Sequence, residues 1–160
     1  AMLRNFMFLR RFHFGIILAL TLCVAPVSAM SGASFDTGRV AVVTAKGTFN
    51  LNVELALNSD QRAQGLMGRK EMASNAGMLF DFERTEPVAM WMKNTLISLD
   101  MLFLDDGGYI VFIARNTQPG SLRHISPGRP VRGVLELNAG TATRLSIKPG
   151  DRVLHSRFGG

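Results

Sequence analysis

Hydrophobic and polar residues alternate most regularly over residues 49–57. Every second residue there is apolar, and three of the four residues between them are polar. A period of two places the apolar side chains on one face of a β-strand and the polar side chains on the other. A valine-rich run, residues 39–45, precedes this segment across a Lys-Gly turn signal. The pattern predicts two strands that pair as a hairpin with one buried face.

A second hairpin is predicted around the turn sequence Asp-Asp-Gly-Gly at residues 105–108. Two apolar runs, residues 99–104 and 109–114, flank this turn, and a tight turn that ends in glycine favours a hairpin. Residues 77–82 are also apolar. Three further segments are strand candidates by the same criteria: residues 88–93, 133–137 and 152–155.

A short helix is predicted over residues 60–67. Asn58 and Ser59 can accept hydrogen bonds from its free amides, and Asp60 lies favourably near the positive end of the helix dipole. Residues 138–145 form a turn or a second short helix. About seven or eight short strands with one or two short helices predict a mainly β fold, either a compact single-domain β-sandwich or a small barrel.

The first 29 residues predict a secretory signal peptide. Three arginines form a basic n-region, an apolar run follows over residues 14–24, and Val27-Ser28-Ala29 supplies small residues for cleavage. The apolar run is shorter than the ~20 residues that span a bilayer, and an uncleaved anchor is the alternative. We therefore expect a periplasmic or secreted protein with no membrane span after cleavage. Its expected organisation is a signal peptide over 1–29, a flexible leader over 30–38, a β domain over 39–155 and a loose tail over 156–160.

Charge and cysteine content narrow the chemistry of the mature chain. Removing residues 1–29 takes away three arginines and no acid, so the formal net charge falls from +6 to +3. This small excess gives little support to nucleic-acid binding, and we expect no nucleic-acid partner. Cys23 lies inside the signal segment, so the mature chain has no thiol for a disulfide, a metal or catalysis. His124 and His155 are too few for a histidine-rich zinc site, and we predict no metal site and no cofactor.

Most catalytic signatures are absent from the sequence. It contains no phosphate-binding GxxxxGK[ST] loop, no GxSxG nucleophile elbow and no HExxH metal motif. A serine nucleophile would need a histidine base, and His124 lies in a long loop where nearby serines are more simply loop residues. The sequence therefore does not decide between an enzyme and a binding protein.

Four sequence words resemble, in order, the family called domain of unknown function 192, or uncharacterised protein family 0127. They are RAQGLMGRKEM at residues 62–72, GMLFDF at 77–82, VAMWMKNTLISLDMLFLDDGGYIV at 88–111 and VLELNAG at 134–140. The resemblance covers about 100 residues and implies a compact, mostly β domain, often behind a signal peptide, with no established activity. One departure is Ala89-Met90 before Trp91, where the family often has an aromatic residue.

Two carboxylates lie inside apolar strands and are the main candidates for chemistry. Asp100 shares its predicted strand face with Leu102, and Glu136 shares its face with Val134. A buried carboxylate must be paired, hydrogen-bonded or protonated. One interpretation is an internal polar network that braces the loops. The other is a small polar or anionic ligand bound at the mouth of the barrel or sandwich, by residues Arg62, Arg69, Trp91, Lys93, Asn94, Asp100 and Glu136.

Three function hypotheses follow from these residues. The first is a non-catalytic small-ligand-binding or accessory module that uses the set above. The second is a glycan-acting hydrolase or lyase with Asp100 and Glu136 as acid and base. The third is a Cu(I) carrier through methionine thioethers, for which packing in the core is the simpler interpretation. The methionines concerned are Met67, Met78, Met90, Met92 and Met101.

The long segment over residues 115–132 is basic and rich in proline. Loops of this length in compact domains are often binding loops or lids, and an anion or an acidic surface is a candidate partner. A solvated connection that the prolines stiffen is the alternative.

Overall fold

The two predicted hairpins belong to one seven-stranded sheet, one at an end of it and the other next to the outer strand at the opposite end. The computed structural model of the protein describes residues 32–158, so the predicted signal peptide lies outside the described residues. Both hairpins pair antiparallel, and the first has Thr44 opposite Gly47 at its turn. The elements are β1 (Asp36–Thr44), β2 (Gly47–Ala56), α1 (Ser59–Gln64), β3 (Ala76–Glu86), β4 (Leu99–Leu104), β5 (Ile110–Ala114), β6 (Val131–Asn138), α2 (Thr141–Arg144) and β7 (Arg152–Leu154).

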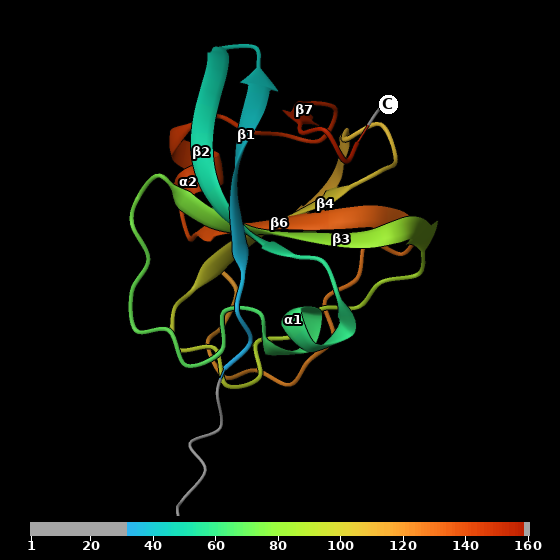
Figure 1. Ribbon diagram of the computed structural model, residues 1–160. Helices are drawn as coiled ribbons and strands as arrows, with labels where there is room; N and C mark the ends of the chain where they lie inside the picture. Colours follow the sequence, from blue (N-terminus) through green and yellow to red (C-terminus); the bar gives the residue numbers. More distant parts are fainter. Residues whose placement is uncertain (1–31, 159–160) are drawn as a thin grey trace, which may run out of the picture. The chain divides into compact units, whose positions relative to one another are not determined.

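The sheet is mixed and strongly curled. Its strand order is β5-β4-β6-β3-β2-β1-β7, and β2 and β3 are the one parallel pair among the described strands. Figure 1 shows β1 and β2 crossing β3 and β6 at a steep angle. The two outer strands approach each other at one end, where Tyr109 bridges to Arg152 and the Ile110 amide donates to the Asp151 carbonyl at 2.8 Å. The fold is therefore a half-barrel, which confirms the predicted mainly β class.

Both faces of the sheet are covered by apolar side chains. One cluster fills the face that carries Leu79, Leu102 and Leu135, together with residues of β1, β2 and β7. The other cluster covers the opposite face of β3, β4 and β6 and includes Phe80 and Met101. Burial of these side chains supplies the main driving force for folding. No helix among residues 32–158 is long and apolar enough to cross a membrane.

Three local expectations differ from the structure. Residues 88–93 are not a strand, because their backbone makes only one isolated bridge, from Met90 to Ile125. Strand β1 already begins at Asp36, inside the expected leader. The C-terminal residues as far as Phe158 are not loose, since the Phe158 side chain is buried in the first cluster. Tertiary contacts with distant residues decide all three outcomes.

Candidate functional site

A buried carboxylic acid lies on the second face of the sheet. Glu136 is in the middle of β6, opposite Met78 of β3 and Met101 of β4. Only 3% of its surface is exposed, and it lines a pocket of about 250 Å³. This volume corresponds to roughly eight water molecules, so the pocket suits a small ligand.

The pocket is mainly apolar and is assembled from several segments besides β6, which carries Glu136. Phe80 and Phe82 of β3 form one wall, and the chain that leaves α1 contributes Leu66 and Met67. Residues 89–91 also line the pocket. Thr95 is the other buried polar side chain of the pocket. An apolar cavity with a few convergent polar groups is the usual form of a small-molecule site.

The Glu136 carboxyl has no partner among residues 32–158. No described side chain or amide donates a hydrogen bond to it, and no described cation pairs with it. Burial raises the pKa of Glu136 from 4.5 to about 8, because desolvation disfavours the charged form. At neutral pH the group is therefore a protonated acid that can donate one hydrogen bond into the pocket.

Trp91 lies at the mouth of the pocket and is 42% exposed. The Lys93 ammonium is 5.0 Å from the centroid of its ring, which is within cation–π range. The centroid of the His124 imidazole lies 6.3 Å from the centroid of the Trp91 ring. Trp91 is the only tryptophan of the chain, so its fluorescence reports on this mouth alone.

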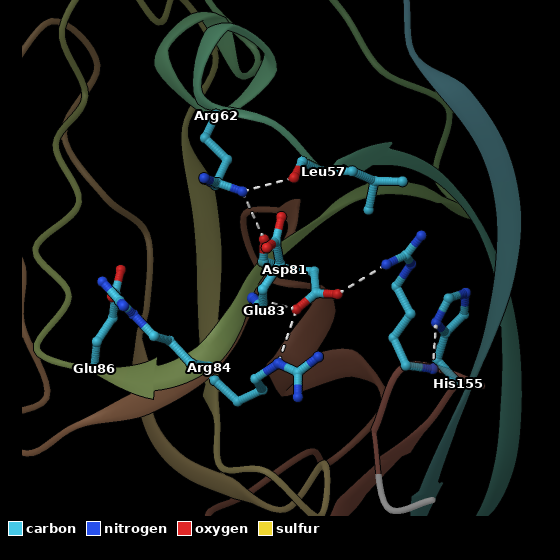
Figure 2. Close-up of polar contacts among 9 residues, drawn as sticks. Leu57, Arg62, Asp81, Glu83, Arg84, Glu86 and His155 are labelled. Atoms are coloured by element: carbon cyan, nitrogen blue, oxygen red, sulfur yellow. Dashed lines mark hydrogen bonds and ion pairs between the residues drawn. The ribbon is translucent and has the colours of Figure 1, made fainter.

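Arg62 is fixed at the edge of the pocket. Its Nη1 donates to the carbonyls of Leu57, at 2.7 Å, and Asp81, at 2.9 Å, as Figure 2 shows. Its guanidinium carbon also lies 5.7 Å from the centroid of the Phe82 ring. These contacts hold one positive charge beside the apolar wall.

Comparison with known proteins identifies the fold family. The family model described as DUF192, Uncharacterized ACR, COG1430, matches residues 41–155. The chain belongs to this DUF192 family. No curated protein matches the chain.

Two solved structures are similar to this DUF192 protein. One is a "putative transcription regulator" from Sinorhizobium meliloti 1021, with 51% identity and a TM-score of 0.75 over 78% of this chain and 97% of the other. The second is a protein of unknown function from Novosphingobium aromaticivorans DSM 12444, with 34% identity and a TM-score of 0.73 over 77% of this chain and 94% of the other. Both relatives therefore consist almost entirely of the half-barrel domain.

The structure brings only part of the predicted set together. Arg62, Trp91 and Glu136 line the same pocket. Lys93 reaches the pocket only through its contact with Trp91, and Lys93 and Asn94 line a separate, shallow recess. Arg69 instead pairs with Glu54 at another surface depression.

Asp100 has a structural role in this DUF192 protein. Its two carboxyl oxygens accept hydrogen bonds from the amides of Asn116 and Ala142, both at 2.9 Å, and its side chain is fully buried. In the pairing of β4 with β6, Asp100 is opposite Leu137, whereas Glu136 is opposite Met101. The two acids therefore point to opposite faces of the sheet. An acid–base pair across one substrate needs both groups on the same side, so this geometry does not support the glycosidase hypothesis.

The methionines also occupy different environments. Met78, Met92 and Met101 are fully buried in the second cluster, and the Thr117 hydroxyl donates to the Met92 sulfur at 3.2 Å. Met67 lies in the pocket wall. These positions agree with packing, which was the simpler interpretation of the methionines.

Asp81 forms the most connected ionic cluster among the described residues. Its carboxylate accepts hydrogen bonds from Arg132 Nε at 2.9 Å, the Glu83 amide at 2.8 Å and Arg157 Nη1 at 3.1 Å (Figure 2). Burial alone would raise the pKa of Asp81, but these hydrogen bonds hold it below its usual value. Its oxygens are satisfied within the protein, which indicates a brace between β3, β6 and the C-terminus.

Sequence reasoning missed the aromatic wall of the pocket. Met78, Phe80 and Phe82 alternate along β3, so a period-two analysis of this segment would have placed them on one face.

Proposed function

We propose that this protein is a non-catalytic module that binds a small anionic or polar ligand with an apolar body, in the periplasm or outside the cell. One observation carries the proposal: Glu136 is an almost fully buried acid without a partner in the part of the chain that the structure describes, and it lines a mainly apolar pocket. No fully enclosed side-chain oxygen or nitrogen among the described residues lacks a hydrogen-bond partner, so the unpaired Glu136 carboxyl faces the open space of the pocket, where a ligand can reach it. Location outside the cytoplasm rests on the signal-like first 29 residues.

The charges around the pocket favour an anion. Arg62 is the cation of the pocket wall, and Lys93 lies over Trp91 at its mouth. Glu136 is the one acid that lines the pocket, and it is neutral below about pH 8. A ligand carboxylate can accept the hydrogen bond that protonated Glu136 donates, while its apolar body contacts Phe80 and Phe82. Above this pH the ionised Glu136 would repel the ligand.

Three small aromatic probes of nearly equal size test the proposal. Benzoate, benzamide and benzylamine carry a negative, a neutral and a positive head group on the same ring. Binding is followed by Trp91 fluorescence at about pH 6 and about pH 9.5, on either side of the Glu136 titration. We expect benzoate to bind best at the lower pH and at least about tenfold more weakly at the higher pH. Benzamide should bind with little dependence on pH.

Variants at two acids separate the pocket from general charge effects. Glu136→Gln keeps a neutral hydrogen-bond donor, so benzoate should bind it equally at both pH values. Glu54→Gln removes an acid that pairs with Arg69 outside the pocket and should behave as the wild type. Binding of benzylamine alone, or benzoate binding that Glu136→Gln leaves pH-dependent, would show that the anionic assignment is wrong.

A further inference from the structure

Three large apolar side chains are exposed on two neighbouring loops. Leu122 is 65% exposed, Leu96 is 57% exposed, and Trp91 at the pocket mouth is partly exposed. Leu96 and Leu122 line the same shallow recess. Single exposed leucines are common on proteins, but a group of them usually marks a contact site. We call this group the loop surface, and we define it by Trp91, Lys93, Leu96, Leu122, Arg123 and His124.

Hydrogen bonds hold the two loops of this surface together. Met90 and Ile125 exchange both backbone bonds, at 2.9 and 2.8 Å. The Met92 amide donates to the Ser121 carbonyl at 3.0 Å, and the Gly120 amide donates to the Thr95 carbonyl at 3.1 Å. The exposed leucines are therefore presented on a fixed scaffold that needs no rearrangement before binding.

The charge around the loop surface is positive. Between Glu86 and Asp105 the chain has one acid, the buried Asp100, and between Asp106 and Glu136 it has none. Lys93 and Arg123 are exposed, and neither forms an ion pair with a described residue. An adjacent loop is joined to this surface by the hydrogen bond that the Gly68 amide donates to the Asn94 carbonyl. This loop adds the exposed Lys70 and Glu71, whose opposite charges offset each other.

We infer that the loop surface docks on a membrane that contains anionic phospholipid. Leucine side chains gain free energy when they enter the boundary of the acyl chains, and tryptophan prefers the head-group level. Lys93 and Arg123 would then lie near the lipid phosphates, where each basic residue strengthens binding. Trp91 and Lys93 also border the mouth of the ligand pocket, but Leu96, Leu122 and Arg123 do not line that pocket, so the inference goes beyond the proposed ligand.

A bilayer accounts for both features of the surface, whereas DNA accounts for one. Phosphates of DNA would attract Lys93 and Arg123, but they offer no apolar layer for Leu96 and Leu122. A lipid surface places an apolar layer directly beneath its phosphates. The combination of exposed leucines with cations that form no ion pair to a described residue therefore favours lipid.

Vesicle binding tests the inference with residues 30–160. The Sinorhizobium chain, 51% identical, matches this protein over 97% of its own length, so a chain of little more than this domain is folded in that relative. The probes are vesicles of phosphatidylcholine with about 30% phosphatidylglycerol, and vesicles of phosphatidylcholine alone. We expect co-sedimentation and a blue shift of Trp91 emission with the first, at least about tenfold weaker binding to the second, and loss of binding in high salt.

Matched substitutions locate the contact. The double variant Leu96→Ser with Leu122→Ser, and the variant Arg123→Glu, should each weaken binding at least about fivefold. The controls are Leu154→Ser, an exposed leucine on β7, and Lys46→Glu, an exposed lysine at the β1–β2 turn, and both should bind as the wild type.

The remaining outcomes would overturn the inference. Controls that weaken binding as much as the loop variants would place the contact elsewhere. Binding to a DNA duplex without binding to either vesicle would assign the surface to nucleic acid. Benzoate binding provides an independent readout, because the two serine substitutions lie outside the pocket and should leave it unchanged. Failure of docking can therefore be distinguished from failure of the proposed ligand site.

Discussion

Glu136 and Asp100 show how the same residue type acquires different roles in adjacent strands. Both carboxyls are buried, but two backbone amides satisfy Asp100, whereas no described group satisfies Glu136. A satisfied carboxylate stabilises the fold, and an unsatisfied one destabilises it whenever the acid must ionise. The protein thus retains at position 136 a group that weakens its own core, which is typical of a functional residue.

The pH dependence of stability tests this view of Glu136. Its pKa is about 8 in the folded protein and near 4.5 in the unfolded chain, so the folded state holds the proton longer. Stability from this group is complete below about pH 4.5 and falls as the pH rises to about 8. Glu136→Gln removes the titration. Between about pH 5 and pH 8, the free energy of unfolding of the wild type should fall by about 3 kcal/mol relative to the variant.

Urea denaturation of both proteins across this pH range measures the difference. Glu54→Gln is the control, because Glu54 pairs with Arg69 at the surface. It should show no comparable change relative to the wild type. Parallel pH profiles for the wild type and Glu136→Gln would mean that the carboxyl ionises freely in the folded state, against the buried-acid description.

At the scale of elements, the sequence identifies structure wherever the signal is local. The period-two pattern and the turn residues place β1, β2, β4 and β5, because neighbouring residues alone decide a hairpin. The strand faces of Asp100 and Glu136 also follow from their neighbours. Whether the two side chains point to the same face does not follow, because it depends on the register between β4 and β6, which are far apart in the sequence. This is why Glu136 lies in the pocket, whereas Asp100 lies in the core on the other face.

Residues 88–93 show the opposite limit of a local analysis. The run of apolar residues resembles a strand, but its edge meets a loop rather than another strand, through the bridge from Met90 to Ile125. Trp91 and Lys93 consequently lie at a pocket mouth and a loop surface instead of in a sheet. The apolar composition of residues 88–93 predicts burial, but a segment forms a strand only where a neighbouring strand is available to pair with it.

Helix α1 gives a test at this scale, because it is only six residues long. The Asn58 side chain accepts a hydrogen bond from the Gln61 backbone amide at 2.9 Å. In return, the Gln61 side-chain oxygen accepts a hydrogen bond from the Asn58 backbone amide at 3.2 Å. This capping box supports a helix that is too short to be stable alone. Asn58→Ala should lower the free energy of unfolding by about 1 kcal/mol.

The same variant should also affect the pocket, since α1 carries Arg62 and leads into Leu66. We expect weaker benzoate binding in Asn58→Ala, measured by Trp91 fluorescence. Asn50→Ala, on the exposed face of β2, is the control and should change neither stability nor binding beyond about 0.5 kcal/mol. Equal stability of the two variants would show that the cap does not hold the helix.

At the scale of the whole domain, the C-terminal residues fasten the half-barrel. Strand β7 pairs with β1 on one side and meets the β4–β5 turn region on the other. Beyond it, Phe158 packs closely against Gly133 of β6, where an added Cβ would lie 2.7 Å from the ring. Arg157 reaches Asp81 of β3. These contacts connect Arg157 and Phe158 to strands in the middle of the sheet.

Truncation after His155 should therefore destabilise the domain. It removes a buried phenylalanine and one of the two arginines that neutralise Asp81. Loss of a buried phenylalanine side chain costs about 3–5 kcal/mol, a large part of the stability of a domain of this size. Urea denaturation should show a lower midpoint for this truncated chain than for a chain that ends at Phe158.

Two point variants divide this effect between packing and charge. Phe158→Ala should reproduce most of the loss, because the ring fills space that the glycine at position 133 leaves open. Arg157→Gln should cost only about 1 kcal/mol, since its side chain is partly exposed and Arg132 still pairs with Asp81.

If the chain that ends at His155 and the chain that ends at Phe158 unfolded at the same urea concentration, the sheet would close without its C-terminal residues. Its two outer strands would then be held by the backbone bonds between Ile110 and Asp151 and their neighbours.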